Sequence, residues 1–265
     1  MKKTDNIFIA GHNGLVGSAV VQLLKKKGFR NILTVNKKKL DLRNFNNVKK
    51  YFKDKKIDYM VMAAAKAGGI IANSTNQRDF FFHNIEIQNS LLKLAQTKKV
   101  KRTIFLGTSC IYPKFSKTPI KEKYLLTGVL EKTNQCYAIA KIAGIKLCET
   151  LYEDHNLDVV CLMPTNVYGK NDKFDKINGH VIPALISKFE EAKKKNFKQV
   201  KLLGTGKPLR EFIHSDDLAS AIGFILKKKI KNDKKLLRLI KQTSVINVGS
   251  GIEYSVANFA KIICK

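Results

Sequence analysis

The sequence predicts an α/β protein built on a doubly wound parallel sheet, with a smaller C-terminal lobe. Short apolar runs alternate with amphipathic stretches of helix length up to Met163, which is the pattern of βαβ units. A glycine-rich turn directly follows the first apolar run, and the regular alternation loosens after Pro164. With 265 residues, 44% of them hydrophobic, the chain can bury a large core and is not mainly disordered.

The elements of the first part are predicted in strict alternation. The strands are apolar runs of strand length, which indicates burial on both faces: Asn6–Ala10, Asn31–Val35, Asp58–Ala65, Arg102–Gly107 and Asp158–Met163. The helices between them are amphipathic: Leu15–Lys27, Phe45–Lys53, Asp79–Lys98 and Asn134–Glu153. Right-handed crossovers then place helices on both faces of one sheet, which is the Rossmann-type arrangement.

The later part of the chain is less regular. We predict helices over His180–Lys195, Ser215–Lys229 and Val256–Cys264, and short strands over Gln199–Leu203, Glu211–Ile213 and Val245–Val248. The lysine-rich stretch Lys227–Lys241 is expected to be an exposed insertion. We therefore divide the chain into a sheet domain, residues 1–170, and a lobe, residues 171–265, packed at the edge where ligands bind in such folds.

The net charge of +29 suggests nucleic-acid binding at first sight. However, 44 of the 50 basic residues are lysines and only 6 are arginines, and no segment interleaves arginine with aromatic residues. We therefore expect solvated lysine-rich faces and no nucleic-acid partner. A basic surface would still attract an anionic nucleotide.

Five scattered cysteines without a CxxC pair argue against a disulfide framework and against a metal site. No apolar run approaches the roughly 18 residues of a membrane span. The apolar stretch behind the first residues is too short for a signal peptide. We expect a soluble, cytoplasmic protein without a membrane partner.

The turn after the first strand is predicted to bind a dinucleotide. It comprises Gly11, His12, Asn13, Gly14, Leu15, Val16 and Gly17, and glycines at this spacing let a pyrophosphate approach the start of the next helix. The second strand ends in Asn36 and three lysines beginning at Lys37, with no acidic residue, which favours NADP over NAD. Alternatively, these lysines form only a solvated turn. Asp41 is expected near the adenine.

A tyrosine and a lysine lie four residues apart on one predicted helix face, Tyr137 and Lys141. A nearby cation favours the phenolate, so this pair can exchange a proton near neutral pH. Thr108, at the end of the fourth strand, places a hydroxyl where it can contact a substrate carbonyl. The order of glycine loop, hydroxyl and YxxxK is that of the short-chain dehydrogenase/reductase superfamily.

A closer resemblance is carried by segments along almost the whole chain. They are GHNGLVGSA (11–19), AAAKAGGI (63–70), FLGTSCIYPK (105–114), YAIAKIAGIKLCE (137–149), MPTNVYG (163–169), HVIPALISKF (180–189) and REFIHSDDLA (210–219). Through them the chain resembles the GDP-L-fucose synthases, the GDP-4-keto-6-deoxy-D-mannose 3,5-epimerase-4-reductases of the extended short-chain superfamily. The resemblance implies epimerisation at C3 and C5 followed by NADPH-dependent reduction of the C4 ketone.

The resemblance also implies roles for individual residues. Tyr137 would donate the proton for reduction, Lys141 would assist it and bind the nicotinamide ribose, and Thr108 would replace the family's serine. Cys110 and His180 would move the C3 and C5 protons, which the ketone acidifies. Without the resemblance, Cys110 reads as a packed residue and His180 as a helix cap.

The remaining implied contacts concern cofactor and substrate. The cofactor would also touch His180 and two strand-end segments: Leu106, Gly107, Thr108 and Ser109, and Pro164, Thr165, Asn166 and Val167. Lys188, Leu203 and Arg210 match substrate-contacting positions, although Arg210 could instead pair with Glu211 or Asp216. The family also implies a homodimer.

The chain departs from the family at a few positions. Asn13 stands where relatives often have arginine, Lys188 replaces an arginine and Leu203 an aromatic residue. Family members continue beyond the equivalent of Lys265, so we expect an incomplete lobe and weaker substrate affinity. Two alternatives stay open: an enzyme acting on another nucleotide sugar, or a truncated, non-catalytic protein that binds a cofactor or nucleic acid.

Overall fold

The computed structural model describes residues 1–202, 204–228, 233–234, 236, 239 and 243–264. Within them, a six-stranded parallel sheet has the strand order β2-β1-β3-β4-β5-β8. Its strands are β1 (Ile7–Ala10), β2 (Ile32–Leu33), β3 (Tyr59–Met62), β4 (Arg102–Leu106), β5 (Val159–Pro164) and β8 (Val245–Val248). The predicted fold class, a Rossmann-type doubly wound sheet, is confirmed.

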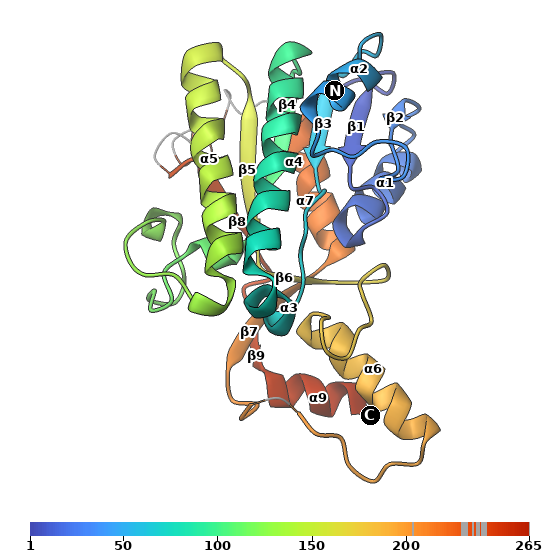
Figure 1. The fold of residues 1–265 in the computed structure, drawn as a ribbon, viewed down its shortest axis with the longest axis vertical. Helices are drawn as coiled ribbons and strands as arrows, with labels where there is room; N and C mark the ends of the chain where they lie inside the picture. Colours follow the sequence, from blue (N-terminus) through green and yellow to red (C-terminus); the bar gives the residue numbers. More distant parts are fainter. Residues whose placement is uncertain (203, 229–232, 235, 237–238, 240–242, 265) are drawn as a thin grey trace.

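Helices cover both faces of this sheet (Figure 1). One face carries α2 (Phe45–Tyr51), α4 (Gln77–Thr97) and α5 (Gln135–His155), and the other carries α1 (Leu15–Lys26) and α7 (Ser215–Lys227). Successive strand residues point to opposite faces: Phe8 and Phe105 lie in the first core, whereas Ile7 and Ile104 lie in the second. Both faces are buried, which explains the continuous apolar strand sequences.

The strand order reverses direction at β1, which pairs with β2 on one side and β3 on the other. In such sheets ligands bind beyond the carboxyl ends of the strands at this reversal. The segments that follow β1, β3, β4 and β5 all meet at that edge because these strands are parallel. The glycine turn, Thr108 and Pro164 therefore belong to one region of the molecule.

Beyond this edge lies the lobe, which Figure 1 shows at the end opposite the N-terminus. It contains α6 (Val181–Lys194), α9 (Val256–Cys264) and a small sheet of β6 (Asn166–Tyr168), β7 (Leu209–His214) and β9 (Glu253–Ser255). A short helix after β3, α3 (Ile70–Thr75), lies at the boundary between the sheet and the lobe. The short helices η1 (Ser109–Ile111), η2 (Glu122–Tyr124) and η3 (Lys132–Asn134) form part of the connection from β4 to α5.

Some predicted elements are wrong. Residues 199–202 form no strand, because none of the described strands pairs with them, and Leu203 lies outside the described residues. The second strand is shorter than predicted, since it is an edge strand paired only through Ile32 and Leu33. Three further elements, α3, β6 and β9, were not predicted because they are too short for a periodic signal. Much of the lysine-rich insertion, and Lys229 of the predicted helix, lie outside the described residues.

Two elements beyond residue 170 return to the large sheet. The α7 helix packs beside α1 through Leu218 and Ile222, and β8 pairs with β5. We therefore propose that the nucleotide domain comprises residues 1–165 together with α7 and β8, while the substrate lobe takes β6 and the rest. A single division at residue 170 does not describe this arrangement, because the chain crosses between the two units more than once.

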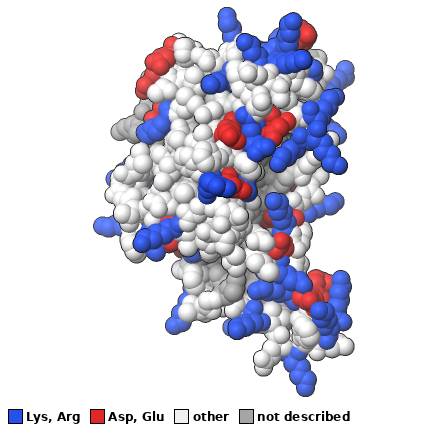
Figure 2. Space-filling model, in the orientation of Figure 1, with Lys and Arg blue, Asp and Glu red and all other residues white. Residues whose placement is uncertain are grey.

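Charged residues are unevenly distributed over the surface. Figure 2 shows lysines and arginines along the edge near α1 and α2 and over the lobe, while much of the face over α4 and α5 is uncharged. No helix among the described residues combines the length and the apolar character needed to cross a bilayer. Nor do the described residues include a cluster of three side chains arranged to ligate a metal.

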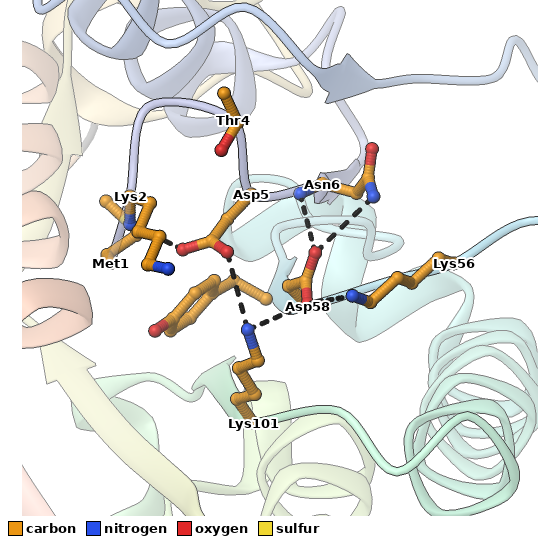
Figure 3. Close-up of a pocket in the computed structure, with 9 residues that line it drawn as sticks. Met1, Lys2, Thr4, Asp5, Asn6, Lys56, Asp58 and Lys101 are labelled. Atoms are coloured by element: carbon orange, nitrogen blue, oxygen red, sulfur yellow. Dashed lines mark hydrogen bonds and ion pairs between the residues drawn. The ribbon is translucent and has the colours of Figure 1, made fainter.

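The amino ends of the strands are joined by an ionic network at the edge opposite the ligand-binding edge (Figure 3). The buried Asp58 carboxylate accepts a hydrogen bond from the Asn6 backbone N–H at 2.9 Å and pairs with the Lys101 ammonium at 2.9 Å. Lys101 also reaches Asp5 at 3.4 Å. Burial raises the pKa of Asp58, but the bonds from Asn6 and Lys101 lower it by more, so it lies below its ordinary value.

Asp58→Asn is expected to lower the free energy of unfolding by about 2 kcal/mol. The amide keeps the Asn6 contact but loses the ion pairs with Lys101 and with Lys56, whose ammonium lies 3.4 Å from the Asp58 carboxylate. The native carboxylate stabilises the fold above the pKa that it has in the unfolded chain, and this contribution is lost as pH falls through its lower native pKa. The variant's deficit should therefore shrink in acid. Urea unfolding across pH measures this, with the exposed Asp54→Asn as control. Equal deficits at neutral and acid pH would contradict the electrostatic origin.

Candidate active site

The glycine turn after β1 forms a backbone cradle. Gly11 has a φ of +82°, and a Cβ there would lie 2.6 Å from the Ala64 nitrogen, so only glycine fits. A Cβ on Gly17 would lie 2.1 Å from the Gly11 oxygen, which explains the second required glycine. Gly14 precedes α1 without a side-chain cap, and the first turn of α1 has no acidic residue. The helix start therefore keeps backbone N–H groups available for an anion.

The region expected to contact the adenosine end lies beside this turn. The Asn13 amide donates to the Asn36 side-chain oxygen at 2.7 Å, which links the turn to the end of the second strand. Lys37 is exposed. Asp41 is bound by the Arg43 guanidinium, whose Nε donates to its two oxygens at 3.0 and 2.9 Å. This hydrogen bonding lowers the pKa of Asp41 to about 2. Its charge is therefore already matched by a cation that the sequence analysis missed.

Thr108 and Cys110 follow β4 at the same edge. The Thr108 hydroxyl oxygen accepts a hydrogen bond from the Cys110 backbone N–H at 3.3 Å and so caps the short helix η1. Because the hydroxyl oxygen acts as acceptor, its hydrogen can be donated to a ligand. Leu106 and Gly107 are buried and Ser109 is partly exposed, so the exposure of the chain increases from the end of β4 towards the site.

Tyr137 and Lys141 lie one turn apart on α5. The Lys141 ammonium is 5.9 Å from the centre of the Tyr137 ring and donates to the Leu106 carbonyl oxygen at 2.8 Å. Burial lowers the pKa of Lys141 to about 8. Burial and the neighbouring Cys110 raise the pKa of Tyr137 above its ordinary value. Burial therefore holds the phenol in its neutral form, which is the form a proton donor requires, and the assistance expected from Lys141 stays a prediction.

Cys110 is surrounded by polar groups that the sequence analysis did not connect to it. The Asn134 amide donates to its sulfur at 3.2 Å, and the Asn134 side-chain oxygen is buried with no hydrogen-bond partner among the described residues. Burial raises the pKa of the Cys110 thiol, while the Thr108 hydroxyl and the Arg210 guanidinium oppose that rise. Thr108, Tyr137 and Arg210 therefore each interact with Cys110.

His180 directly precedes α6. It makes no capping hydrogen bond from its side chain, so the simple role of a helix cap does not apply. Its Nδ1 lies 3.4 Å from the Asp172 carboxylate, and its side chain is 41% exposed. The preceding backbone contacts the segment after β3, where the Gly69 N–H donates to the Asn178 oxygen at 2.9 Å.

The β5–β6 connection completes the strand-end edge. The Thr165 N–H donates to the Val248 oxygen at 3.0 Å, and its hydroxyl is buried without a hydrogen-bond partner among the described residues. The Asn166 amide donates to the Glu211 backbone oxygen at 2.9 Å, which joins this segment to β7. Pro164 ends β5, and Val167 lies within β6.

The predicted substrate contacts are spread over the lobe. Lys188 lies on the helix that follows His180, and its ammonium contacts the Lys201 oxygen at 3.4 Å. Arg210 is exposed on β7 and donates to the Leu209 oxygen, while Glu211 instead accepts from the Gly251 N–H. The alternative pairing of Arg210 with Glu211 is thus not formed, and the Asp216 carboxylate lies 3.7 Å from the His214 Nδ1. Leu203 lies outside the described residues.

Three residues near the predicted site were missed: Arg43, Asn134 and Asp172. Arg43 had a signal, since an arginine two residues after an aspartate can bind it. Asn134 stands three residues before Tyr137 and so one helical turn away, which could have been noticed. Asp172 had none, because it lies in a loop eight residues from His180 and no periodicity relates the two.

Comparison with known proteins agrees with this geometry. Residues 7–249 match the NAD dependent epimerase/dehydratase family. The chain is 45% identical over 261 residues to GDP-L-fucose synthase 1 of Arabidopsis thaliana, covering 98% of this chain and 77% of that protein. It is 42% identical over 261 residues to GDP-L-fucose synthase of Escherichia coli K12, covering 98% and 81%.

A solved structure is similar as well. The GDP-mannoheptose C4 reductase of Campylobacter jejuni, determined with NADP bound, has a TM-score of 0.87 and 35% sequence identity. The match covers 99% of this chain and 85% of that one. The folded arrangement of the sheet and lobe is therefore shared with an enzyme that reduces a nucleotide-linked sugar.

Proposed function

The chain belongs to the NAD dependent epimerase/dehydratase family, and we propose that it converts GDP-4-keto-6-deoxy-D-mannose to GDP-L-fucose by 3,5-epimerisation and NADPH-dependent reduction at C4. The observation that carries this proposal is the meeting of Cys110 with Thr108 and Tyr137 in one site. A reductase alone needs the hydroxyl, the phenol and the lysine. The thiol beside them supplies a second proton-transferring group, as epimerisation requires.

The residues present fit NADP(H). The glycine cradle and the uncapped start of α1 suit a pyrophosphate, and Lys37 offers a cation for a 2′-phosphate. We propose that Lys141 and the strand-end residues at 106–109 and 164–167, with His180, line the rest of that site. The side chains of Asn13 and Asn36 are uncharged and are bonded to each other. Lys37 and the lysines that follow it therefore supply the positive charge for the 2′-phosphate at the adenosine end of the site. When bound, NADPH supplies the hydride that reduces C4.

The chain's own residues then account for the proton movements. The C4 ketone acidifies the C3 and C5 protons, and we propose that the Cys110 thiolate and the His180 imidazole remove and return them. The Thr108 hydroxyl donates to the C4 oxygen and holds the ketone in place. The neutral Tyr137 phenol delivers its proton to that oxygen during reduction, and the Lys141 ammonium stabilises the phenolate left behind.

Basic residues of the lobe are proposed to bind the nucleotide. Lys188 and Arg210 suit the diphosphate charge, and Arg210 adds a field at Cys110. Leu203 is proposed as an apolar contact for the base. Arg210 would then couple substrate binding to the state of the thiol, since a bound diphosphate neutralises the same guanidinium that opposes the rise in the pKa of Cys110.

The decisive experiment is to supply GDP-4-keto-6-deoxy-D-mannose with NADPH or NADH, follow cofactor oxidation and identify the sugar by NMR. GDP-L-fucose formed preferentially with NADPH supports the proposal. An unepimerised reduced sugar would remove Cys110 and His180 from their roles. Absence of turnover, with NADPH still bound, would instead favour another nucleotide sugar. Preference for NADH would contradict the assignment of Lys37.

We further propose that the protein works as a cytoplasmic homodimer. All five cysteines are free thiols, which is consistent with a reducing compartment. The face formed by α4 and α5 carries exposed apolar residues, with Phe82 53% and Ile139 41% exposed, flanked by Phe81, Ile85 and Ala143. Figure 2 shows few charges over much of this face. Two such faces packed together would bury a four-helix interface.

Phe82→Asp is expected to weaken dimerisation at least about tenfold, because a carboxylate would be desolvated at the centre of the interface. Light scattering coupled to size exclusion, measured over a concentration series, gives the mass against the 29.9 kDa of one chain. Phe115→Asp is the matched control, since Phe115 is 81% exposed but lies outside this face. A folded Phe82→Asp protein that stays dimeric would exclude this face as the interface.

A further inference from the structure

The loop between β6 and α6 contains a buried carboxylate that the proposed mechanism has not used. The Asp172 side chain is only 5% exposed. Its Oδ1 accepts from the Lys173 N–H at 2.8 Å and lies 3.4 Å from the His180 Nδ1. Its Oδ2 is buried and has no hydrogen-bond partner among the described residues. A carboxylate in this position is costly unless a neighbouring group becomes positive.

The loop that carries Asp172 is held in place from several sides. The Asn171 amide donates to the Ser18 hydroxyl on α1 at 2.8 Å, and the Asp172 N–H donates to the Gly169 oxygen at 3.2 Å. Further along, the Ser187 hydroxyl of α6 donates to the Phe174 oxygen at 2.9 Å. Asp172 is therefore presented to His180 by a loop tied to both α1 and α6.

The turn of this loop is shaped by a different aspartate. Asp175 accepts backbone N–H bonds from Ile177 and Asn178, each at 2.8 Å. The Asp172 side chain accepts one backbone hydrogen bond, from the adjacent Lys173, and otherwise lies beside His180. Its burial is therefore not explained by the backbone conformation of the loop. The neighbour that remains to account for the burial of this carboxylate is the His180 imidazole.

We propose that Asp172 is a positioning residue for His180, an inference that rests on the proposed epimerisation. Its carboxylate accepts the Nδ1–H of His180, which orients the ring and leaves Nε2 as the nitrogen that exchanges protons with the sugar. When Nε2 takes a proton, the adjacent Asp172 carboxylate stabilises the positive charge of the imidazolium. The carboxylate can do so through Oδ2 as well as Oδ1, because Oδ2 has no other hydrogen-bond partner among the described residues. The 3.4 Å separation is that of an unliganded site, where such contacts are commonly long.

The test separates the two half-reactions. Epimerisation is followed as deuterium uptake at C3 and C5 of GDP-4-keto-6-deoxy-D-mannose, with NADP⁺ present so that no reduction occurs. The reductase half is followed in reverse, as NADPH formed when GDP-L-fucose is oxidised at C4. That step moves a hydride to NADP⁺ and the hydroxyl proton to the phenolate form of Tyr137, which is the form that reduction leaves, and it requires no epimerisation.

Asp172→Asn is expected to slow deuterium uptake about 30-fold, mainly in kcat, because the amide can present its N–H to Nδ1 and favour the wrong tautomer. Oxidation of GDP-L-fucose should change by less than about twofold. Asp216→Asn is the matched control: its carboxylate lies 3.7 Å from the His214 Nδ1 but is 71% exposed. Equal loss in both half-reactions, or unchanged uptake, would overturn the proposal.

A measurement on the unaltered protein covers the case in which Asp172→Asn does not fold. Nitrogen NMR of the imidazoles, at a pH where they are neutral, should show His180 as the Nδ1–H tautomer, with His180→Asn identifying its signals. The Nε2–H tautomer would overturn the proposal. Absence of deuterium uptake by the wild-type enzyme would instead overturn the proposed function, so the two failures are distinguishable.

Discussion

Tyr137→Phe is expected to slow reduction of the C4 ketone about 10³-fold while deuterium exchange at C3 and C5 continues. The phenol is held neutral by burial and by the nearby thiol, so it is ready to deliver a proton to the ketone oxygen. Phenylalanine fills the same space and keeps the edge-to-face contact with Phe80, whose ring centre is 6.1 Å away. The loss therefore comes from the missing proton. Single-turnover NADPH oxidation and NMR of the sugar measure the two effects.

Tyr152→Phe is the matched control for this experiment, because Tyr152 lies on the same helix and is 45% exposed. It should leave both half-reactions unchanged. If Tyr137→Phe reduced the ketone at the wild-type rate, another group would have to be the proton donor. If it stopped C3 and C5 exchange as well, the separation of roles between Tyr137 and Cys110 would fail.

Cys110→Ser is expected to slow C3 and C5 exchange about 10³-fold, while NADPH binding and oxidation of GDP-L-fucose persist. A serine hydroxyl is far too weak an acid to supply the anionic base at ordinary pH. The substitution keeps an atom that can accept the 3.2 Å hydrogen bond from Asn134, so the local structure should survive. Deuterium exchange monitored by NMR, with cofactor affinity measured by fluorescence, tests both parts.

Cys136→Ser provides the comparison for Cys110, because its thiol is also partly exposed near the start of α5 but contacts Gln77 instead. The Cys136→Ser variant should catalyse C3 and C5 exchange at the wild-type rate. The pH profile adds a second check. Burial raises the pKa of Cys110, so exchange by the thiolate should keep increasing with pH beyond about 8.5, where an ordinary thiol titrates. Unchanged exchange in Cys110→Ser would exclude the thiol as the base.

The sheet could be predicted because its signals are local. The buried strands β1, β3 and β4 are apolar runs, a helix follows each of them before the next strand, and the order of such units restricts the topology. The return of β8 to the sheet could not be predicted. Val245–Val248 is equally compatible with a lobe strand, and only its pairing with β5 decides between them.

The candidate site was predictable to the extent that spacing determines geometry. Tyr137 and Lys141 face the same side because four residues make about one helical turn. Thr108 reaches the site because it follows a strand that ends at the ligand-binding edge. The protonation of Tyr137 was not predictable, because it depends on burial and on Cys110, which is distant in sequence.

By itself, the sequence determined the fold class, the glycine cradle of Gly11–Gly17, and the combination of Thr108, Cys110, Tyr137 and Lys141. The fold class, the cradle and the group of Thr108, Tyr137 and Lys141 follow from periods and spacings within one or two elements, whereas Cys110 was assigned only through the family resemblance. Only the tertiary structure decided that Asp172 faces His180, that Asn134 bonds Cys110, and that Arg43 takes the Asp41 carboxylate. The physical reason is that a charge or hydrogen bond depends on separation in space and on exclusion of water, and neither is determined by distance along the chain.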